Sequence, residues 1–238
     1  MKVIVNGAAG RMGAEVLAAV KSGYKNSVLA YAADQGTPIN DYNGEADVIV
    51  DFSHHSATED ICAYAVKRKL PIVIATTGQT ADELEIIKKA SESVPVFLSG
   101  NMSVGIALLA ELAKKAAAAF PDADIEIVEK HHNRKEDAPS GTALMIAKEI
   151  CSVREDAEIK SGRSGLCKRS ANEIGIQSVR AGNIVGIHEV LICTDTQAIT
   201  LKHEAYSRSL FAEGGLTAAS FLCTQTVPKL YNMYDMLK

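Results

Sequence analysis

The opening of the chain constrains its fold more than any other stretch. The short run "KVIVN" is rich in β-branched residues, "GAAGRMG" follows at once, and "AEVLAAVKSG" carries apolar residues at helical spacing. Gly7, Gly10 and Gly13 fall in the turn as G-x-x-G-x-x-G. Glycine there lets the backbone approach a pyrophosphate, whose charge is met by free amides and the helix dipole. The order is typical of a dinucleotide-binding unit, although a tight turn without a ligand would look similar.

The rest of the first hundred residues repeats this alternation. The runs "SVLAYAAD", "ADVIVDFS", "PIVIATTG" and "VPVFLSGN" are predicted strands, and "ATEDICAYAVKRK" and "TADELEIIKKASES" are predicted helices, the second with a capping box between Thr80 and Glu83. Near-continuous apolar strands separated by amphipathic helices indicate a parallel sheet covered on both faces. We therefore predict an α/β fold class with an N-terminal, Rossmann-like, doubly wound parallel sheet over residues 1–102.

The second half changes character. A helix, "VGIALLAELAKKAAAAF", is followed by the alternating run "IEIVEK" and then by the predicted strands "IGIQSVRAG", "IVGIHEVLICT" and "QAITLKHEAY". Strands joined by short polar turns predict a second α+β domain with a mixed open sheet over residues 103–207. The polar residues 160–173 are predicted to be a long mobile loop. A final helical segment is expected to pack back, so that residues 208–238 complete the first domain.

Composition excludes several functions. The 25 Lys and Arg residues are outnumbered by 29 Asp and Glu and form no basic run, which argues against nucleic-acid binding. Five widely spaced cysteines without a C-x-x-C pair indicate neither a disulfide framework nor a zinc site, and favour a reducing, cytoplasmic compartment. No apolar run reaches about 18 residues and the opening lacks a cleavable leader, so neither secretion nor a membrane span is predicted. The expected class is small-molecule chemistry.

Three further segments are candidate nucleotide contacts. Asp34, at the end of the second predicted strand, stands where an acid binds the adenosine ribose, although an ordinary turn residue could stand there too. Its surroundings, "ADQGTP", hold no cation for a 2′-phosphate, so we predict that NADH is favoured over NADPH, with Arg11 a partial compensation. "ATTG" (75–78) and "SGNM" (99–102) follow strand ends and leave room for a nicotinamide and its ribose, or are simply polar turns.

The run "EKHHNRKEDAPSGTAL" (129–144) concentrates titratable groups in one connection. It brings His131 and His132 together with a helix whose first turn, "SGTA", offers two hydroxyls and a glycine amide at a positive helix end, a ready carboxylate site. A hydride transfer needs a matching proton, which a His or a Lys of lowered pKa can supply. The alternatives are solvated histidines, an ordinary N-cap at Ser140, or a metal site; without further ligands of suitable spacing, no metal is predicted.

Taken together, "GAAGRMG", "ATTG", "NMSVG", "HHNRKEDAPSGTA" and "SVRAGNIVG", in this order, resemble the 4-hydroxy-tetrahydrodipicolinate reductase (dihydrodipicolinate reductase) family of lysine and diaminopimelate synthesis. The resemblance implies the reduction of a cyclic imine dicarboxylate by NADH or NADPH, with loss of water from the 4-hydroxy precursor. It implies that His131 is the proton donor and acceptor, Lys135 a second proton donor and His132 a substrate contact. Gly141 and Thr142, which follow Ser140, would bind the substrate carboxylate.

The resemblance also assigns residues to the nucleotide and implies an assembly. The nucleotide residues are Gly7, Ala8, Ala9, Gly10, Arg11, Met12, Asp34, Ala75, Thr76, Thr77, Ser99, Gly100, Asn101 and Met102. The implied assembly is a homotetramer built through the second domain's sheet. The chain departs from the family in "ATTG" for the commoner "GTTG", in Ile187 where many members have an acid, and in the turn "HHSAT".

Three other functions compete with this interpretation. An amino-acid dehydrogenase would share the glycine turn without needing the titratable run, a nucleotide sensor would tolerate loss of His131 and Lys135, and a metal-dependent hydrolase would lose activity in chelator.

Overall fold

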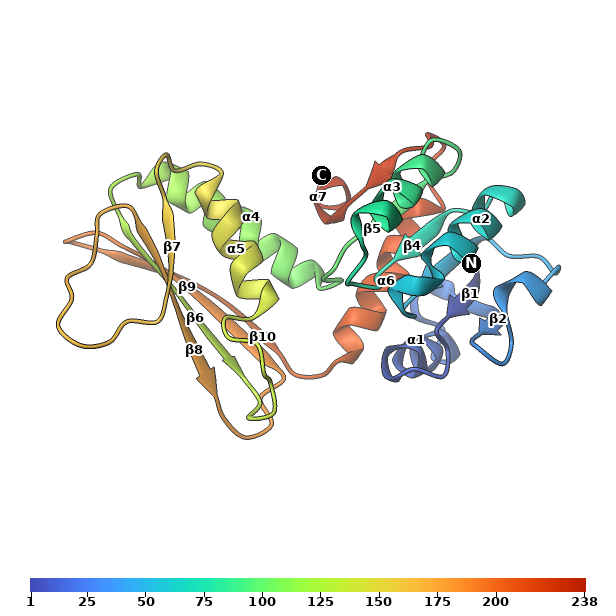
Figure 1. The fold of residues 1–238 in the computed structure, drawn as a ribbon, viewed down its shortest axis with the longest axis horizontal. Helices are drawn as coiled ribbons and strands as arrows, with labels where there is room; N and C mark the ends of the chain where they lie inside the picture. The colour runs from blue at the N-terminus through green and yellow to red at the C-terminus, as the bar shows by residue number, and fades with distance from the viewer. The chain divides into compact units, whose positions relative to one another are not determined.

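The computed structural model describes all 238 residues. The chain divides into two compact units, Met1–Ser103 with Arg208–Lys238, and Val104–Ser207 (Figure 1). None of the helices is long and apolar enough to cross a membrane.

The first unit is built on a six-stranded sheet in the order β11-β5-β4-β3-β1-β2, and every pairing in it is parallel. Its strands are β1 (Lys2–Asn6), β2 (Val28–Ala33), β3 (Val48–Asp51), β4 (Ile72–Ile74), β5 (Val96–Leu98) and β11 (Leu230–Tyr231). The chain moves outward from β1 in one direction to β2 and in the other to β3. Ligands of open parallel sheets bind at such a reversal, beyond the carboxyl ends of the strands.

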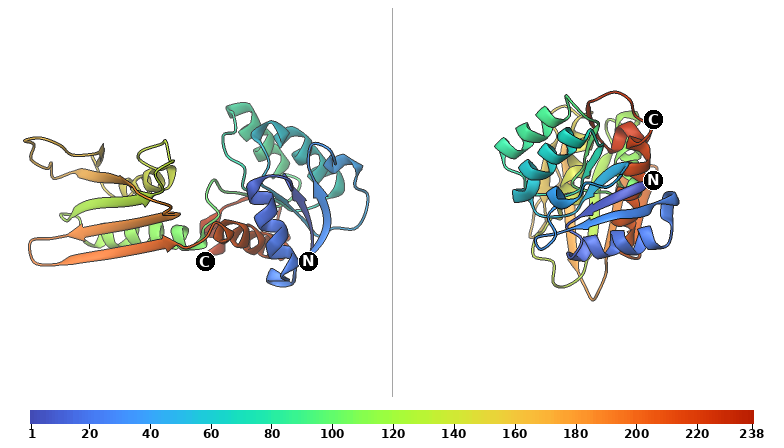
Figure 2. Two further views of the ribbon diagram at one scale, coloured as in Figure 1. Left: turned by 90° about the horizontal axis from the view of Figure 1, so that it is seen from below. Right: turned by 90° about the vertical axis from the view of Figure 1, so that its right-hand side faces the viewer.

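Helices cover both faces of this sheet. α1 (Arg11–Lys21) packs beside α6 (Ser209–Leu222), and α2 (Thr58–Arg68) packs beside α3 (Ala81–Ala90) on the opposite face (Figure 2). The predicted capping box of Thr80 and Glu83 is present at the start of α3. α6 lies close to the chain at Met102, because a Cβ on Gly214 would stand 1.7 Å from the Met102 carbonyl oxygen. Three 3₁₀ helices, Tyr24–Asn26, Ile39–Asp41 and His55–Ala57, and the short α7 (Met233–Met236) complete the unit.

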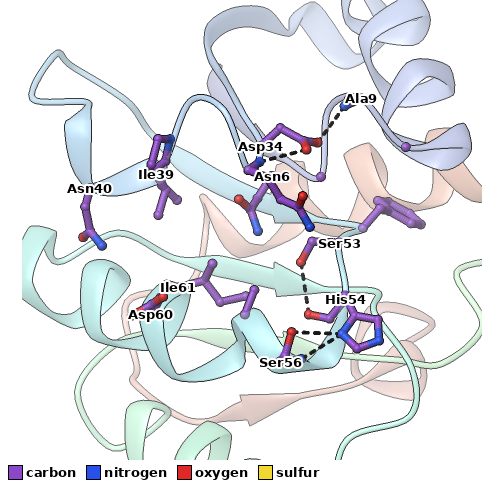
Figure 3. Close-up of a pocket in the computed structure, with 16 residues that line it drawn as sticks. Asn6, Ala9, Asp34, Ile39, Asn40, Ser53, His54, Ser56, Asp60 and Ile61 are labelled. Atoms are coloured by element: carbon purple, nitrogen blue, oxygen red, sulfur yellow. Dashed lines mark hydrogen bonds between the residues drawn. The ribbon is translucent and has the colours of Figure 1, made fainter.

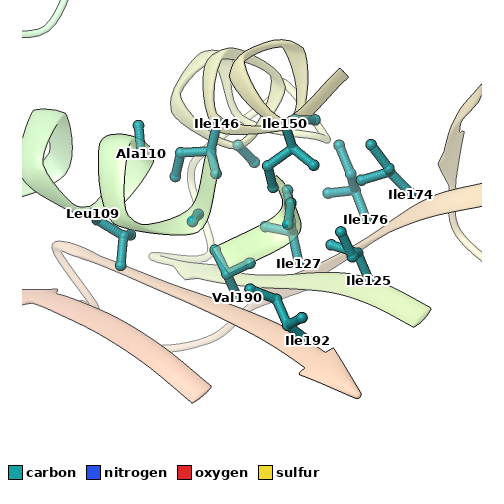
Figure 4. Packing of buried hydrophobic residues seen from close by; sticks show 14 of the residues in the cluster. Leu109, Ala110, Ile125, Ile127, Ile146, Ile150, Ile174, Ile176, Val190 and Ile192 are labelled. Carbon is teal, nitrogen blue, oxygen red and sulfur yellow. The ribbon is translucent and has the colours of Figure 1, made fainter. Parts of the chain in front are cut away.

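The second unit is a five-stranded mixed sheet in the order β10-β9-β6-β8-β7. Its strands are β6 (Asp124–His131), β7 (Glu158–Ser161), β8 (Glu173–Arg180), β9 (Gly186–Cys193) and β10 (Ala198–Ala205). The central β6 runs parallel to β8 and antiparallel to β9. α4 (Val104–Ala119) and α5 (Gly141–Cys151) bury one face over a core of Ile125, Ile127, Ile146, Ile150, Ile174, Ile176, Val190 and Ile192 (Figure 4). The predicted fold class, a doubly wound parallel sheet plus a mixed open sheet, is confirmed.

Besides the 3₁₀ helices, two strands and one α-helix were not predicted: β7, β11 and α7. β7 includes Lys160 and Ser161, so the segment expected to be a loop from residue 160 begins two residues later. All four side chains of β7 are exposed, and the strand is held by parallel pairing with β8 and by the Lys160–Glu173 ion pair. Because an edge strand of this kind buries no face, its side chains leave no periodic signal.

Ile146, on α5, tests the core of the second unit. Its side chain is fully buried, so Ile146→Ala should lower the free energy of unfolding by about 2–5 kcal/mol. Leu108 on α4 is 47% exposed, and Leu108→Ala should change it by less than about 0.5 kcal/mol. Urea denaturation of both variants measures the difference, and equal losses would contradict the assigned core.

Candidate active site

The larger pocket of the first unit lies at the carboxyl ends of β1, β2 and β3. It has a volume of about 660 Å³ and is lined by Gly7, Ala9 and Gly10 of the glycine turn, among others. Asp34 closes one side (Figure 3): its Oδ2 accepts from the Ala9 amide at 2.8 Å and its Oδ1 from the Gln35 amide at 2.8 Å. Each oxygen keeps lone pairs for a further donor, such as a ribose hydroxyl.

The charges of this pocket are negative. Its lining includes the acids Asp34 and Asp60 and contains no lysine or arginine. Arg11, considered above as a partner for a 2′-phosphate, lines a different pocket.

That second pocket has a volume of about 330 Å³ and shares only Phe52 with the first. It is lined by Arg11, Met12, Phe52, Ala75, Gly100, Met102, Arg208 and Phe211. Arg208 and Phe211 come from the start of α6. Neither was predicted as a site residue, because this segment was predicted only to be a helix that packs against the first domain. Of the predicted nucleotide residues, Ala8, Thr76, Thr77, Ser99 and Asn101 line neither pocket.

A buried carboxylate ties the strand ends of the first unit together. Asp51, 1% exposed at the end of β3, accepts from Asn6 Nδ2 at 2.8 Å, Ser53 Oγ at 2.6 Å and Thr76 Oγ1 at 2.6 Å. Burial raises the pKa of Asp51, against the lowering effect of these neutral donors. The Thr76 hydroxyl therefore donates its proton to Asp51, and its oxygen can only accept in any contact with a nucleotide.

The turn "HHSAT" follows Asp51 and Phe52. His54 Nδ1 accepts from the Ser56 amide and begins the short helix His55–Ala57, while His55 Nδ1 lies 2.9 Å from the Glu83 carboxylate that caps α3. This turn is thus held by side-chain hydrogen bonds, and His54 lines the larger pocket.

In the second unit, the helix-covered face of the sheet changes from apolar to polar toward one end. On β6, Ile125 and Ile127 are followed on the same face by Glu129 and His131. Directly opposite Glu129 stand Ser178 on β8 and His188 on β9. Glu129, Arg180 and His188 were not predicted as site residues. The sequence did contain a signal for Glu129, because this glutamate continues the alternation of buried residues that Ile125 and Ile127 begin.

Glu129 is the centre of this polar end. Its carboxylate is fully buried and bound by Arg180 through two parallel hydrogen bonds of 2.9 Å and 2.7 Å. His131 Nδ1 lies 2.5 Å from Oε2, and the Ser140 amide donates to Oε1 at 3.2 Å. Although burial opposes ionisation, hydrogen bonds from Arg180, Ser178 and His131 lower the pKa of Glu129 to about 2. An ionised carboxylate only accepts, so His131 Nδ1 carries the proton.

Two buried histidines meet here, and the pKa of each is lowered. The His131 and His188 rings lie edge to face with centroids 5.2 Å apart. Burial, together with the nearby His131, lowers the pKa of His188 to about 3, so that ring is neutral, and its Nε2 lies 3.2 Å from Ser140 Oγ. Burial also lowers the pKa of His131, while Glu129 raises it.

The predicted carboxylate site lies at the start of α5. Ser140 is the N-cap and its Oγ accepts from the Ala143 amide at 3.2 Å. Gly141 is exposed, and Thr142 and His132 are partly buried. Lys135 Nζ lies 2.7 Å from Asp137 Oδ1. Hydrogen bonds from Lys135 and from the Gly141 amide lower the pKa of Asp137. One exposed carboxylate is therefore already held between the lysine and the helix start.

The position of Ile187 in the sheet answers one remaining question from the sequence. Ile187 pairs with Lys130 and Glu204 on the face of the sheet away from His131, so an acid at this position would lie beside Lys130. No group of three or more His, Cys, Asp or Glu side chains is arranged to hold a metal ion.

A glycine turn at the reversal of a parallel sheet, with pockets on both sides of Phe52, and a buried histidine in a second unit define a nicotinamide-dependent oxidoreductase. The family model described as dihydrodipicolinate reductase, N-terminus, matches residues 1–102, and that described as dihydrodipicolinate reductase, C-terminus, matches residues 105–237. The chain belongs to the dihydrodipicolinate reductase family.

Individual relatives agree with this assignment. The 4-hydroxy-tetrahydrodipicolinate reductase of Caldanaerobacter subterraneus subsp. tengcongensis is 44% identical over 100% of this chain and 98% of its own length. That of Alkaliphilus oremlandii is 47% identical over 82% of this chain and 81% of its own length. A solved structure of dipicolinate-bound dihydrodipicolinate reductase from Paenisporosarcina sp. TG-14 is 25% identical with a TM-score of 0.77, covering 98% of this chain and 97% of that one.

The predicted family and reaction are confirmed by these matches: the activity is the NAD(P)H-dependent reduction of 4-hydroxy-tetrahydrodipicolinate to tetrahydrodipicolinate in lysine biosynthesis.

Asp51 provides a test of the first unit. Asp51→Asn keeps an acceptor for Asn6 and Ser53 and offers its amide to the Thr76 hydroxyl, so NADH affinity should stay within a few-fold. Asp51→Leu leaves these donors unsatisfied at about 1–3 kcal/mol each and should weaken NADH binding at least about tenfold. Fluorescence titration with NADH, alongside urea denaturation, compares the variants. Equal behaviour of the two would rule out the acceptor role.

Proposed function

We propose that the second unit binds the imine dicarboxylate and supplies its proton, while the first unit binds the dinucleotide that supplies hydride. His131 is the proton donor and acceptor and Lys135 the second proton donor. His132, Ser140, Gly141 and Thr142 contact the substrate. The observation that carries this proposal is the Glu129 carboxylate, which binds His131 and the amide of Ser140 at the same time. A proton donor and a carboxylate-binding helix start are thereby held side by side.

Asp137 supports the choice of a carboxylate ligand. Its exposed carboxylate is bound by Lys135 and by the Gly141 amide, the groups proposed to receive a substrate carboxylate. A cation and a helix amide bind an anionic oxygen here for the reasons that apply to any helix N-terminus.

The state of His131 suits proton transfer. Its Nδ1–H donates to Glu129, which leaves Nε2 to face a substrate. The lowered pKa makes the imidazolium a stronger acid, so it gives up its proton more readily. The same shift reduces the protonated fraction at neutral pH, and the reaction should therefore slow as pH rises through the His131 pKa.

For the nucleotide, we propose that the larger pocket holds the adenosine half and the smaller pocket the nicotinamide half. Hydride transfer is chemistry that the bound nicotinamide brings. The turn from Gly7 to Met12, Asp34, Ala75 to Thr77 and Ser99 to Met102 contact it. NADH is preferred because the larger pocket has two acids and no lysine or arginine to neutralise a 2′-phosphate.

For the assembly, we propose a homotetramer formed through the sheet of the second unit, in the cytoplasm, with a small dicarboxylate as substrate and neither nucleic acid, membrane nor metal as partner. The face of that sheet away from α4 and α5 leaves Val128, Ile187 and Leu191 partly exposed, which supports burial against another subunit.

Replacing the proposed proton donors tests the mechanism. His131→Ala and Lys135→Ala should each lower kcat by about 10²–10⁴. Lys130→Ala is the matched control, because Lys130 is paired with Glu189 on the other face of β6, and it should remain within a few-fold. The assay generates substrate from pyruvate and aspartate semialdehyde and follows loss of nicotinamide absorbance. If the double variant His131→Ala, Lys135→Ala kept its turnover, both assignments would fall.

Asp34→Ala tests the cofactor preference. Loss of the ribose acceptor should raise the KM for NADH more than that for NADPH, because NADPH also loses a repulsive charge. Asp60→Ala, which removes the other acid of the pocket, is the comparison and should discriminate less. Initial rates with both cofactors measure the ratio, and equal changes after Asp34→Ala would remove the ribose contact.

A further inference from the structure

We propose that Glu129 is a positioning residue that holds His131 with Nε2 toward the substrate and places the proton donor and the carboxylate site in one fixed arrangement. The inference rests on the proposed function of His131 and deepens it.

The geometry excludes a direct role for Glu129 in contacting substrate. The residue is 0% exposed. Its Oε2 receives His131 Nδ1 at 2.5 Å and Arg180 Nη1 at 2.9 Å, and its Oε1 receives Arg180 Nη2 at 2.7 Å and the Ser140 amide at 3.2 Å. A carboxylate has about four lone-pair sites, and these four donors, together with a further hydrogen bond from Ser178, fill them. Glu129 therefore acts through the groups it holds.

Those groups include both ends of the reactive loop. Arg180 Nη2 also donates to the Asp137 carbonyl at 2.7 Å, and the Ser140 amide donates to Glu129 itself. The two anchors lie on either side of Pro139, between Lys135 and the start of α5. A change at Glu129 would consequently release the imidazole and the loop together.

Gly186 lies next to the edge of the His131 ring that carries Nε2. A Cβ on Gly186 would stand 3.2 Å from His131 Nε2, tighter than ordinary van der Waals contact. With Nδ1 bound to Glu129 and Gly186 alongside Nε2, the ring has one orientation in which Nε2 is available. Fixing an imidazole through its other nitrogen also fixes the tautomer.

The charges around His131 determine the direction in which its pKa should move when Glu129 is replaced. Arg180 on β8 and Lys135 on the loop oppose protonation of His131, Glu129 on β6 favours it, and His188 on β9 is neutral. Asp137 lies against Lys135. Loss of the Glu129 charge leaves His131 among cations, so its pKa should fall. Activity that needs protonated His131 would then be lost at a lower pH.

Glu129→Gln is the principal variant, with Glu173→Gln as its matched control. Glu173 is also a buried carboxylate on a strand of the same sheet, 2% exposed and paired with Arg163 and Lys160, but it has no contact with His131. We expect Glu129→Gln to lower kcat about 10–100-fold, the size typical of a residue that orients a functional imidazole. The high-pH limb of kcat/KM should move to lower pH. Glu173→Gln should leave the limb in place.

Histidine ¹⁵N spectra supply a readout without turnover. In the wild type His131 should be the Nδ1–H tautomer, identified by the loss of its signals in His131→Ala. In Glu129→Gln its pKa should be lower and the tautomers mixed. If Glu129→Gln does not fold, Arg180→Lys replaces it: the charge remains but the two-pronged hydrogen bond is lost. That variant should keep the tautomer and raise the KM for the imine substrate, since the Asp137 anchor is released.

An unchanged His131 tautomer, pKa and pH limb in folded Glu129→Gln would overturn the positioning role, as would an Arg180→Lys variant with wild-type KM. Absence of turnover in the wild-type enzyme would instead count against the proposed function. The two failures are therefore distinct.

Discussion

The buried ion pair of Glu129 and Arg180 is the interaction on which the second unit depends. A carboxylate with no exposure is costly unless its charge is matched and its lone pairs are filled. Arg180 provides both through two parallel hydrogen bonds, and it also donates to the carbonyls of Asp137 and Val179. The pair thus joins two strands distant in sequence to the loop between β6 and α5. Removing one partner would leave the other charge buried without its counter-charge. That loss is more damaging than replacing both partners by apolar residues.

Each unit has such a carboxylate at the end of a central strand, and the pKa values of the two are shifted in opposite directions. Asp51 has only neutral donors around it, and burial raises its pKa. Glu129 has an arginine, and its pKa is lowered to about 2. Asp51 organises the strand ends by accepting hydrogen bonds from Asn6, Ser53 and Thr76. A permanent charge at Glu129 instead supports a cationic imidazole. The difference follows from the charge of the partner, because both groups are almost equally buried.

Periodicity accounts for what could be predicted. The apolar strands, the glycine turn and the helix starts each depend on neighbouring residues, so they can be recognised locally, and the titratable loop stood out by composition. The burial of Glu129 could also have been predicted, since it follows Ile125 and Ile127 at a spacing of two residues. Its pairing with Arg180 was not, because it depends on the parallel register that places Glu129 opposite Ser178. β7 left no signal because it buries no side chain.

The sheet of the second unit has an apolar end and a polar end, and the fold alone does not determine which side chains occupy the polar end. An engineered D-amino acid dehydrogenase and a myo-inositol dehydrogenase from Corynebacterium glutamicum share this fold with TM-scores of 0.58 and 0.57 at 12% and 13% identity. A common scaffold therefore persists while most side chains differ. In this chain the isoleucine layer of β6, β8 and β9 buries one end of the strands against α4 and α5, and Glu129, His131, Arg180 and His188 occupy the other end. The apolar end therefore packs the core of the second unit, and the Glu129–Arg180 pair fixes the arrangement of the titratable groups at the polar end.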